Sequence, residues 1–121
     1  MNNYKQLDAW KAAMTLITEI YQLTSVYPKQ EIYGLTSQTK RAAVSIASNT
    51  AEGWGRQYKK DTLQFLHIAR SSLYEGETLL IIATNTGIVK EDRFNEIEIS
   101  WQKSVQLLKG FINYYEKAEL K

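Results

Sequence analysis

Five polar side chains in the middle of the sequence have the spacing needed to work together. They recur at intervals of four, four, three and four residues: Arg41, Ser45, Asn49, Glu52 and Arg56. This spacing places them on one face of a helix, where an arginine guanidinium can hold a carboxylate through two parallel hydrogen bonds. We expect Arg70, Ser71, Ser72 and Glu75 to complete this network from a neighbouring helix. Because buried polar groups need partners with or without a ligand, a structural network is favoured over a ligand site.

A second candidate site is the segment 53–60, which combines two aromatic side chains with three cations and no acid. Aromatic rings can stack on unpaired bases, and cations can neutralise phosphates. Trp54 and Tyr58 are therefore candidates for stacking on nucleic acid. The candidate phosphate contacts are Lys40, Arg41, Arg56, Lys59 and Lys60. The alternative is an ordinary turn between helices, with solvated lysines and with Trp54 packed on the fold.

The formal net charge of +2 is unevenly distributed along the 121 residues. Residues 36–60 hold five bases and one acid, whereas residues 1–35 are neutral and residues 61–121 hold seven bases and nine acids. A local basic patch of this kind attracts anionic partners. It is weaker than the dense basic stripe of a dedicated DNA-binding domain.

Catalytic and metal-binding motifs are missing from the sequence. There is no cysteine, and His67 is the only histidine and lacks the Glu-x-x-His partner of a di-iron bundle. Ser37 and Lys40 match Ser-x-x-Lys without the accompanying elements of a serine hydrolase. Gly53-Trp-Gly55 lacks the rest of a dinucleotide fingerprint. We therefore expect a protein that is not an enzyme and that holds no metal and no cofactor.

Apolar residues spaced by three and four predict four helices that position these groups. The first covers residues 5–26, with the stripe Leu7, Trp10, Met14, Ile17, Tyr21 and Thr24, and ends before Pro28. The second begins with a cap at Thr36 or Ser37, packs Ala42, Ala43, Ile46, Ala47 and Ala51, and ends at Gly53 and Gly55. The third is capped by Asp61 or Thr62, packs Leu66, Ala69, Leu73, Gly76, Leu80 and Ala83, and stops at Gly87. The fourth, about 91–118, packs Phe94, Ile97, Trp101, Ser104, Leu108, Phe111 and Tyr115.

These elements predict one all-α domain over residues 1–121, an antiparallel up-down-up-down four-helix bundle. The run from Leu79 to Ala83 is apolar all round, and such a helix must be buried on every side, which predicts contact with another subunit. No apolar run approaches the ~18 residues of a membrane span. The first residues also lack the apolar stretch of a secretory signal, so we expect a cytoplasmic protein without membrane contact.

Several ordered motifs together resemble a known family over about Leu7–Tyr115. They are Leu7–Met14, Tyr33–Gln38, Arg41–Ile46, Ser48–Gly53, Gly55-Arg56, Phe65-Leu66 and Ile68–Leu73. The set is similar to the small bacterial four-helix bundle proteins encoded within intervening sequences of 23S ribosomal RNA genes. A related protein is the accessory variability determinant of diversity-generating retroelements. The sequence departs from the family pattern at Thr50, where isoleucine is usual, and at Gly76, where a larger apolar residue is usual.

The resemblance implies a homopentamer without enzymatic activity. In the retroelement relative, such an assembly binds nucleic acid and a reverse transcriptase through basic surface. Two functions follow as hypotheses: a homo-oligomeric accessory protein that binds RNA or DNA, or a protein-interaction scaffold with no nucleic-acid role. The scaffold alternative depends on the surplus apolar residues of the third helix and on the aromatic side chains of the fourth, Trp101, Phe111, Tyr114 and Tyr115.

Overall fold

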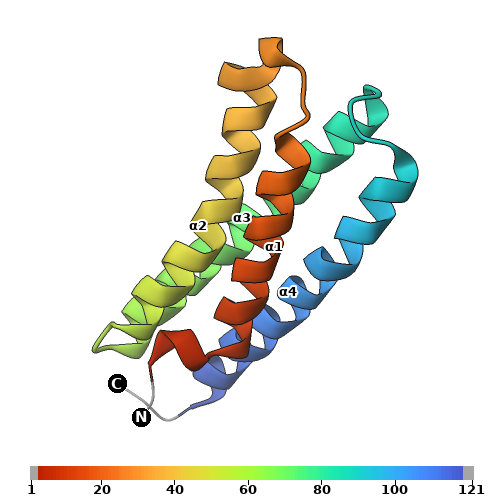
Figure 1. Ribbon diagram of the computed structural model, residues 1–121. Coiled ribbons are helices and arrows are strands. Elements are labelled where there is room, and N and C mark those ends of the chain that lie inside the picture. Colours follow the sequence, from red (N-terminus) through yellow and green to blue (C-terminus); the bar gives the residue numbers. More distant parts are fainter. Residues whose placement is uncertain (1–2, 119–121) are drawn as a thin grey trace.

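The computed structural model describes residues 3–118, which form four long helices and no strand within that range. They are α1 (Asp8–Thr24), α2 (Ser37–Trp54), α3 (Lys59–Asn85) and α4 (Glu91–Lys117). Three short helical turns complete the structure: η1 (Tyr4–Gln6), η2 (Lys29–Glu31) and η3 (Ile32–Thr36). The predicted all-α, four-helix fold is confirmed (Figure 1). The first helix begins three residues later than predicted because Leu7 is extended and separates η1 from α1.

Contacts between the helices pair residues that run in opposite sequence directions. Between α2 and α3, Ser45 meets Ser72, and Gly53 meets Thr62. Between α3 and α4, Leu73 receives a hydrogen bond from Trp101. Further along, Lys59 at the start of α3 reaches the end of α4. The α2–α3 turn, the beginning of α1 and the end of α4 consequently meet at one end of the bundle (Figure 1).

The buried face of α1 differs from the predicted stripe. The residues that enter the core are Ala9, Ala13, Leu16, Ile20 and Leu23. Of the predicted stripe, Thr24 is buried, whereas Met14 and Tyr21 are 40% and 44% exposed and Trp10 and Ile17 are half-buried. Both stripes are apolar, and the small side chains of Ala9 and Ala13 let neighbouring helices approach more closely. The helix therefore turns its alanine stripe inward and leaves the bulkier stripe partly exposed, with Tyr21 beside Lys40 of α2.

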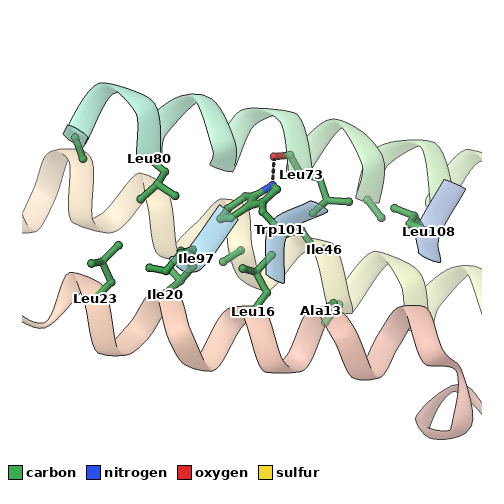
Figure 2. Packing of buried hydrophobic residues seen from close by; sticks show 14 of the residues in the cluster. Ala13, Leu16, Ile20, Leu23, Ile46, Leu73, Leu80, Ile97, Trp101 and Leu108 are labelled. Atoms are coloured by element: carbon green, nitrogen blue, oxygen red, sulfur yellow. Dashed lines mark hydrogen bonds between the residues drawn. The ribbon is translucent and has the colours of Figure 1, made fainter. Parts of the chain in front are cut away.

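The core agrees more closely with prediction on the other helices. All the predicted core residues of α3 are buried, as are Ala42, Ala43, Ile46 and Ala47 of α2. On α4, Ile97, Trp101, Ser104 and Leu108 are buried together with Ile112, while the predicted Phe94, Phe111 and Tyr115 are half-buried. Figure 2 shows the centre of this core, where Nε1 of Trp101 donates to the carbonyl oxygen of Leu73 at 2.9 Å.

Two of the predicted helix caps are wrong. The side chain of Asp61 or Thr62 does not cap α3, whose N-cap position is Tyr58. The Thr62 hydroxyl instead donates to the carbonyl oxygen of Gly53 at 2.8 Å and ties α3 to α2. At the start of α2, Thr36 makes no capping hydrogen bond, because η3 runs directly into the helix. The predicted stop at Gly87 is confirmed: it has a φ of 84° and follows the last turn of α3.

The apolar run near the end of α3 is only partly enclosed by this chain. Leu79, Leu80 and Ala83 are buried, whereas Ile81 and Ile82 are 41% and 44% exposed. The run is therefore buried on one side of α3, and the two isoleucines remain accessible on the other. Within residues 3–118, no helix is long and apolar enough to cross a membrane.

Candidate nucleic-acid interface

Positive charge collects at the end of the bundle where α2 turns into α3. We define the basic end as residues 3–11, 52–61 and 109–118, which lie together in Figure 1. These residues include seven cations and four acids, a net charge of +3. The rest of the described chain, residues 12–51 and 62–108, has seven cations and eight acids. The fold thus separates charge along the bundle axis, and the basic end is the surface best suited to an anion.

Arg56 is held firmly at this end. Its Nη2 donates to Oε2 of Glu52 at 2.6 Å, and its guanidinium lies 4.5 Å from the centroid of the Phe65 ring. The side chains of Arg56 and Glu52 remain 43% and 55% exposed. An arginine stacked on a ring keeps unused N–H donors at its edge. Arg56 can therefore contact a phosphate through these donors. The carboxylate of Glu52 offsets its charge, which weakens the electrostatic part of that contact.

Lys59 has a structural role that its sequence position does not reveal. Its Nζ donates to the carbonyl oxygens of Glu116 at 3.0 Å and Ala118 at 2.9 Å. These carbonyls lie at the end of α4, where the helix dipole places partial negative charge. Lys59 thus caps α4 and fixes it to the α2–α3 turn. The neighbouring Lys60 is exposed and makes no hydrogen bond or ion pair within residues 3–118.

The two aromatic candidates differ in exposure. Tyr58 is 50% exposed at the N-cap position of α3, so its ring is open to a stacking partner. Trp54 is half-buried at the last residue of α2. The structure thus leaves Tyr58 as the better placed of the two for stacking on a base.

The other two candidate cations lie far from this cluster. Arg41 is exposed on α2, 15 residues before Arg56, which corresponds to roughly 22 Å along a helix axis. Lys40 lies beside α1, with its Nζ 4.8 Å from the centroid of the Tyr21 ring. The structure therefore brings Arg56, Lys59, Lys60, Trp54 and Tyr58 together but leaves Lys40 and Arg41 outside that group.

The polar series on α2 divides into two separate groups rather than one network. Ser45 is the centre of the first group: its Oγ accepts from Oγ of Ser72 and from Nδ2 of Asn49, both at 2.8 Å. Glu52 and Arg56 form the second. Of these contacts, the hydrogen bond from Ser72 to Ser45 links α3 to α2, at a partly buried position.

Arg70 and Glu75, also expected in the network, do not join it. Arg70 Nη2 lies 3.1 Å from Nδ1 of His67, on the same helix. Arg70 is two residues from Ser72 on α3, so the two side chains project about 160° apart. Glu75 is exposed, and neither it nor Arg41 has a hydrogen bond or ion pair within residues 3–118.

An open groove next to the basic end was not predicted. It has a volume of about 880 Å³ and follows the outer face of α3. Its lining combines the cations at the start of α3 with polar and apolar side chains: Lys59, Lys60, Leu63, Gln64, His67, Ile68 and Ser71. The spacing of Lys60, Gln64, His67 and Ser71 by four, three and four could have indicated this face. The groove extends the basic end along α3.

A pair of carboxylates lies between α3 and α4, away from the basic end. Nε2 of Gln102 donates to Oε2 of Glu77 at 3.0 Å and to Oε1 of Glu98 at 2.7 Å. A hydrogen bond with Glu98, together with partial burial and the charge of Glu98, raises the pKa of Glu77 to about 7, against the opposing effect of Gln102. The pair therefore holds a shared proton below neutral pH.

The described residues form no group of three or more histidine or acidic side chains suited to a metal ion. The fold and its surfaces instead define a small four-helix protein with one basic end and a partly exposed apolar face. Residues 5–110 match the model of the 23S rRNA-intervening sequence protein family. The chain belongs to that family, as the sequence motifs predicted.

A solved structure supports the fold. It is a protein of unknown function from the S23 ribosomal protein family of Bacteroides thetaiotaomicron, and it is similar with a TM-score of 0.79. The two sequences are 21% identical, and the similarity covers 86% of this chain and 97% of the other. No curated protein matches the chain. At this identity the likeness shows the shared four-helix architecture.

Proposed function

We propose that this protein is a non-enzymatic, homo-oligomeric accessory protein that binds single-stranded nucleic acid through its basic end. The observation that carries the proposal is the separation of charge, with a net +3 at the basic end and an exposed tyrosine among its cations. Arg56 and Lys60 contact phosphates, and Tyr58 stacks on a base. Single-stranded nucleic acid fits this combination because its bases are free to stack.

Self-association makes this modest patch effective. Copies joined in one particle present several patches at once, and the second contact then forms at a high effective concentration. An apolar surface suited to this contact lies on the outside of α1 and α2. It consists of Trp10, Met14, Ile17 and Tyr21 on α1 and Val44 on α2, and we call it the α1–α2 face. A homopentamer is the assembly that the family resemblance implies.

The test is a binding titration with a labelled 20-nucleotide single-stranded RNA at salt concentrations from 50 to 200 mM. Phosphate binding releases counterions, so log K should fall linearly with log salt, by a slope of about 0.7 per phosphate contact on a single strand. Replacing Lys60 with glutamine should weaken binding and make the slope shallower. The matched control is Lys90→Gln, which removes an exposed lysine at the other end of the bundle.

Two results would contradict the proposal. One is affinity that stays constant across this salt range. The other is equal loss of binding in the Lys60 and Lys90 variants, because it would show a response to net charge rather than to the basic end. A matched DNA strand run alongside measures the preference for RNA, since only RNA offers a 2′-hydroxyl.

The second candidate function is a protein-interaction scaffold. The observation that favours it is the α1–α2 face, where Tyr21 is 44% exposed and Val44 is 42% exposed. In this alternative, the face binds a different protein, such as a reverse transcriptase, and the basic end only keeps the protein in solution. The test is a pull-down from nuclease-treated lysate. Recovery of one defined protein by the wild type, and its loss in a Val44→Glu variant, would favour the scaffold if the protein also failed to bind RNA.

A further inference from the structure

The groove of about 880 Å³ on the outer face of α3 has a regular lining. Its polar side chains form one row along the helix, at spacings of four, three and four residues: Lys60, Gln64, His67 and Ser71. The apolar side chains of Leu63 and Ile68 lie on opposite sides of this row. Leu63 is one turn before His67, and Ile68, which is 42% exposed, is one turn after Gln64. The face therefore has two places where an aliphatic side chain lies beside a hydrogen-bonding one.

The ring of His67 has a defined hydrogen-bonding state. Nη2 of Arg70 lies 3.1 Å from its Nδ1, and because a guanidinium can only donate, Nδ1 is the acceptor. This contact requires a neutral ring that carries its proton on Nε2. Nε2 makes no hydrogen bond within residues 3–118 and retains accessible surface. His67 thus presents one free N–H donor on the groove, and Arg70 fixes the orientation of its ring.

The charges along this face favour an anionic occupant. Residues 59–71 hold Lys59, Lys60 and Arg70 against one acid, Asp61, and no acid lines the groove. Lys60 is exposed where the groove meets the basic end. A single strand of nucleic acid combines negative charge with planar bases that have apolar faces and hydrogen-bonding edges. A second copy of this chain, with its own net charge of +2, lacks this complementarity to the groove.

We propose that the outer face of α3 binds bases of the single strand whose phosphates contact the basic end. One base packs on Leu63 and accepts a hydrogen bond from Nε2 of His67. The next packs on Ile68 and forms a hydrogen bond with the side-chain amide of Gln64. Lys60, one turn before these residues, contacts a neighbouring phosphate. This inference rests on the proposed function and adds to it the path of the strand beyond the basic end.

The test compares two 20-nucleotide strands that carry the same phosphates, oligothymidine and a strand of abasic deoxyribose units, in anisotropy titrations at 50 mM salt. The wild-type protein should bind oligothymidine about tenfold or more tightly than the abasic strand, because only the former has bases. Gln64→Ala and His67→Ala should each weaken binding of oligothymidine about fivefold and leave binding of the abasic strand unchanged. Lys60→Gln should weaken binding of both strands alike. The matched control is Gln22→Ala, which truncates an exposed glutamine on α1 and should change neither affinity.

The imidazole of His67 provides a second readout that needs no variant. Because His67 is the only histidine, its ring signals in a proton NMR spectrum are unambiguous. They should shift on addition of oligothymidine, with the affinity measured by anisotropy, and should move far less with the abasic strand.

The possible failures separate this inference from the proposed function. If both strands bind equally and the Gln64 and His67 variants match the wild type, the phosphate contacts stand and the base subsite on α3 is wrong. If Tyr58→Leu alone abolishes the preference for oligothymidine, base stacking is confined to the basic end. If Ile68→Glu lowers the mass of the particle in ultracentrifugation without nucleic acid, a second copy occupies this face. Absence of binding to either strand by the wild type would reject the proposed function and this subsite together.

Discussion

The indole ring of Trp101 lies against the backbone of Gly76 with no room for a side chain between them. A Cβ built on residue 76 would lie 2.7 Å from Cζ2 and 2.8 Å from Cη2 of the ring. Nε1 of Trp101 also donates to Leu73, one turn before Gly76 on α3. Gly76 is therefore the position that leaves space for the ring of Trp101 in the core.

Replacing Gly76 with alanine should give no gain in stability, although alanine is the better helix former. Alanine favours a helix by about 1 kcal/mol over glycine, but here its methyl group would force a rigid, buried ring to move, and such overpacking costs about 1–3 kcal/mol. The free energy of unfolding should thus stay the same or fall by up to about 2 kcal/mol, the difference between these two effects. Urea denaturation with linear extrapolation measures it.

The matched control is Gly110→Ala, in the interior of α4. A Cβ there would meet no atom within 4 Å, so this variant should gain stability from helix propensity alone. The two alanine substitutions should therefore differ clearly, with the Gly110 variant the more stable. If Gly76→Ala stabilises the protein as much as Gly110→Ala, the close approach of Trp101 is wrong.

Trp101→Phe should relieve the restriction at position 76. Alone, this substitution removes the hydrogen bond to Leu73 and part of a fully buried ring, so the unfolding free energy should fall by about 2–4 kcal/mol. In the double variant with Gly76→Ala, the losses should be less than additive, because the smaller ring leaves space for the new methyl group. Additive losses in this double-mutant cycle would rule out direct contact between the two positions.

The Glu77–Glu98 pair predicts a stability that depends on pH. The pKa of Glu77 is raised from 4.5 to about 7 in the folded protein, so the folded state binds a proton more tightly than the unfolded state. The contribution of this group is therefore full below about pH 4.5 and is lost as the pH rises through about 7. Glu77→Gln should flatten this decline and make the protein more stable than the wild type at pH 8.

Glu75→Gln is the control for this experiment, because Glu75 is exposed on the same helix without a hydrogen-bond partner in the described chain. It should leave the pH dependence of unfolding unchanged. The measurement is urea denaturation at intervals from pH 4 to pH 8. Identical pH profiles for the wild type and Glu77→Gln would show that the two carboxylates do not share a proton.

The proposed assembly predicts that a charge on the α1–α2 face will separate the copies. Val44→Glu should lower the mass of the particle in analytical ultracentrifugation while circular dichroism remains helical, because a carboxylate is costly to bury without a partner. Ile99→Glu introduces the same charge at a 75% exposed apolar position on α4 and should leave the mass unchanged. The reverse pattern would assign the interface to α4, and a monomeric wild type would exclude self-association.

The sequence predicted the four helices well, because long stripes of apolar residues repeat at helical spacing. It did not predict which face of α1 is buried, since Leu16 and Tyr21 belong to adjacent stripes that are both apolar. Helical periodicity alone cannot choose between them; the choice depends on how closely α2 and α4 approach Ala13. The same limit explains why the sequence did not reveal the role of Gly76: the ring that it contacts belongs to Trp101, 25 residues away on another helix.

The candidate site was predicted in composition but not in geometry. The group at residues 54–60 is brought together largely because its members are neighbours in sequence. Two of its contacts depend on the fold. Arg56 lies over the ring of Phe65, and Lys59 donates a hydrogen bond to a carbonyl oxygen at the end of α4. The sequence also did not indicate that Oγ1 of Thr36 is buried without a hydrogen-bond partner in the described chain, because a threonine before a helix normally indicates a cap.

The contact of Lys59 with the carbonyl oxygens at the end of α4 couples that end to the α2–α3 turn through a single ammonium group. A chain shortened before Glu116 would return that ammonium to solvent and add a mobile cation beside Lys60. Such a truncation should leave α4 less firmly attached and should increase the electrostatic attraction of this end for polyanions. In the present arrangement, Lys59 is restrained by two hydrogen bonds and holds α4 against the α2–α3 turn.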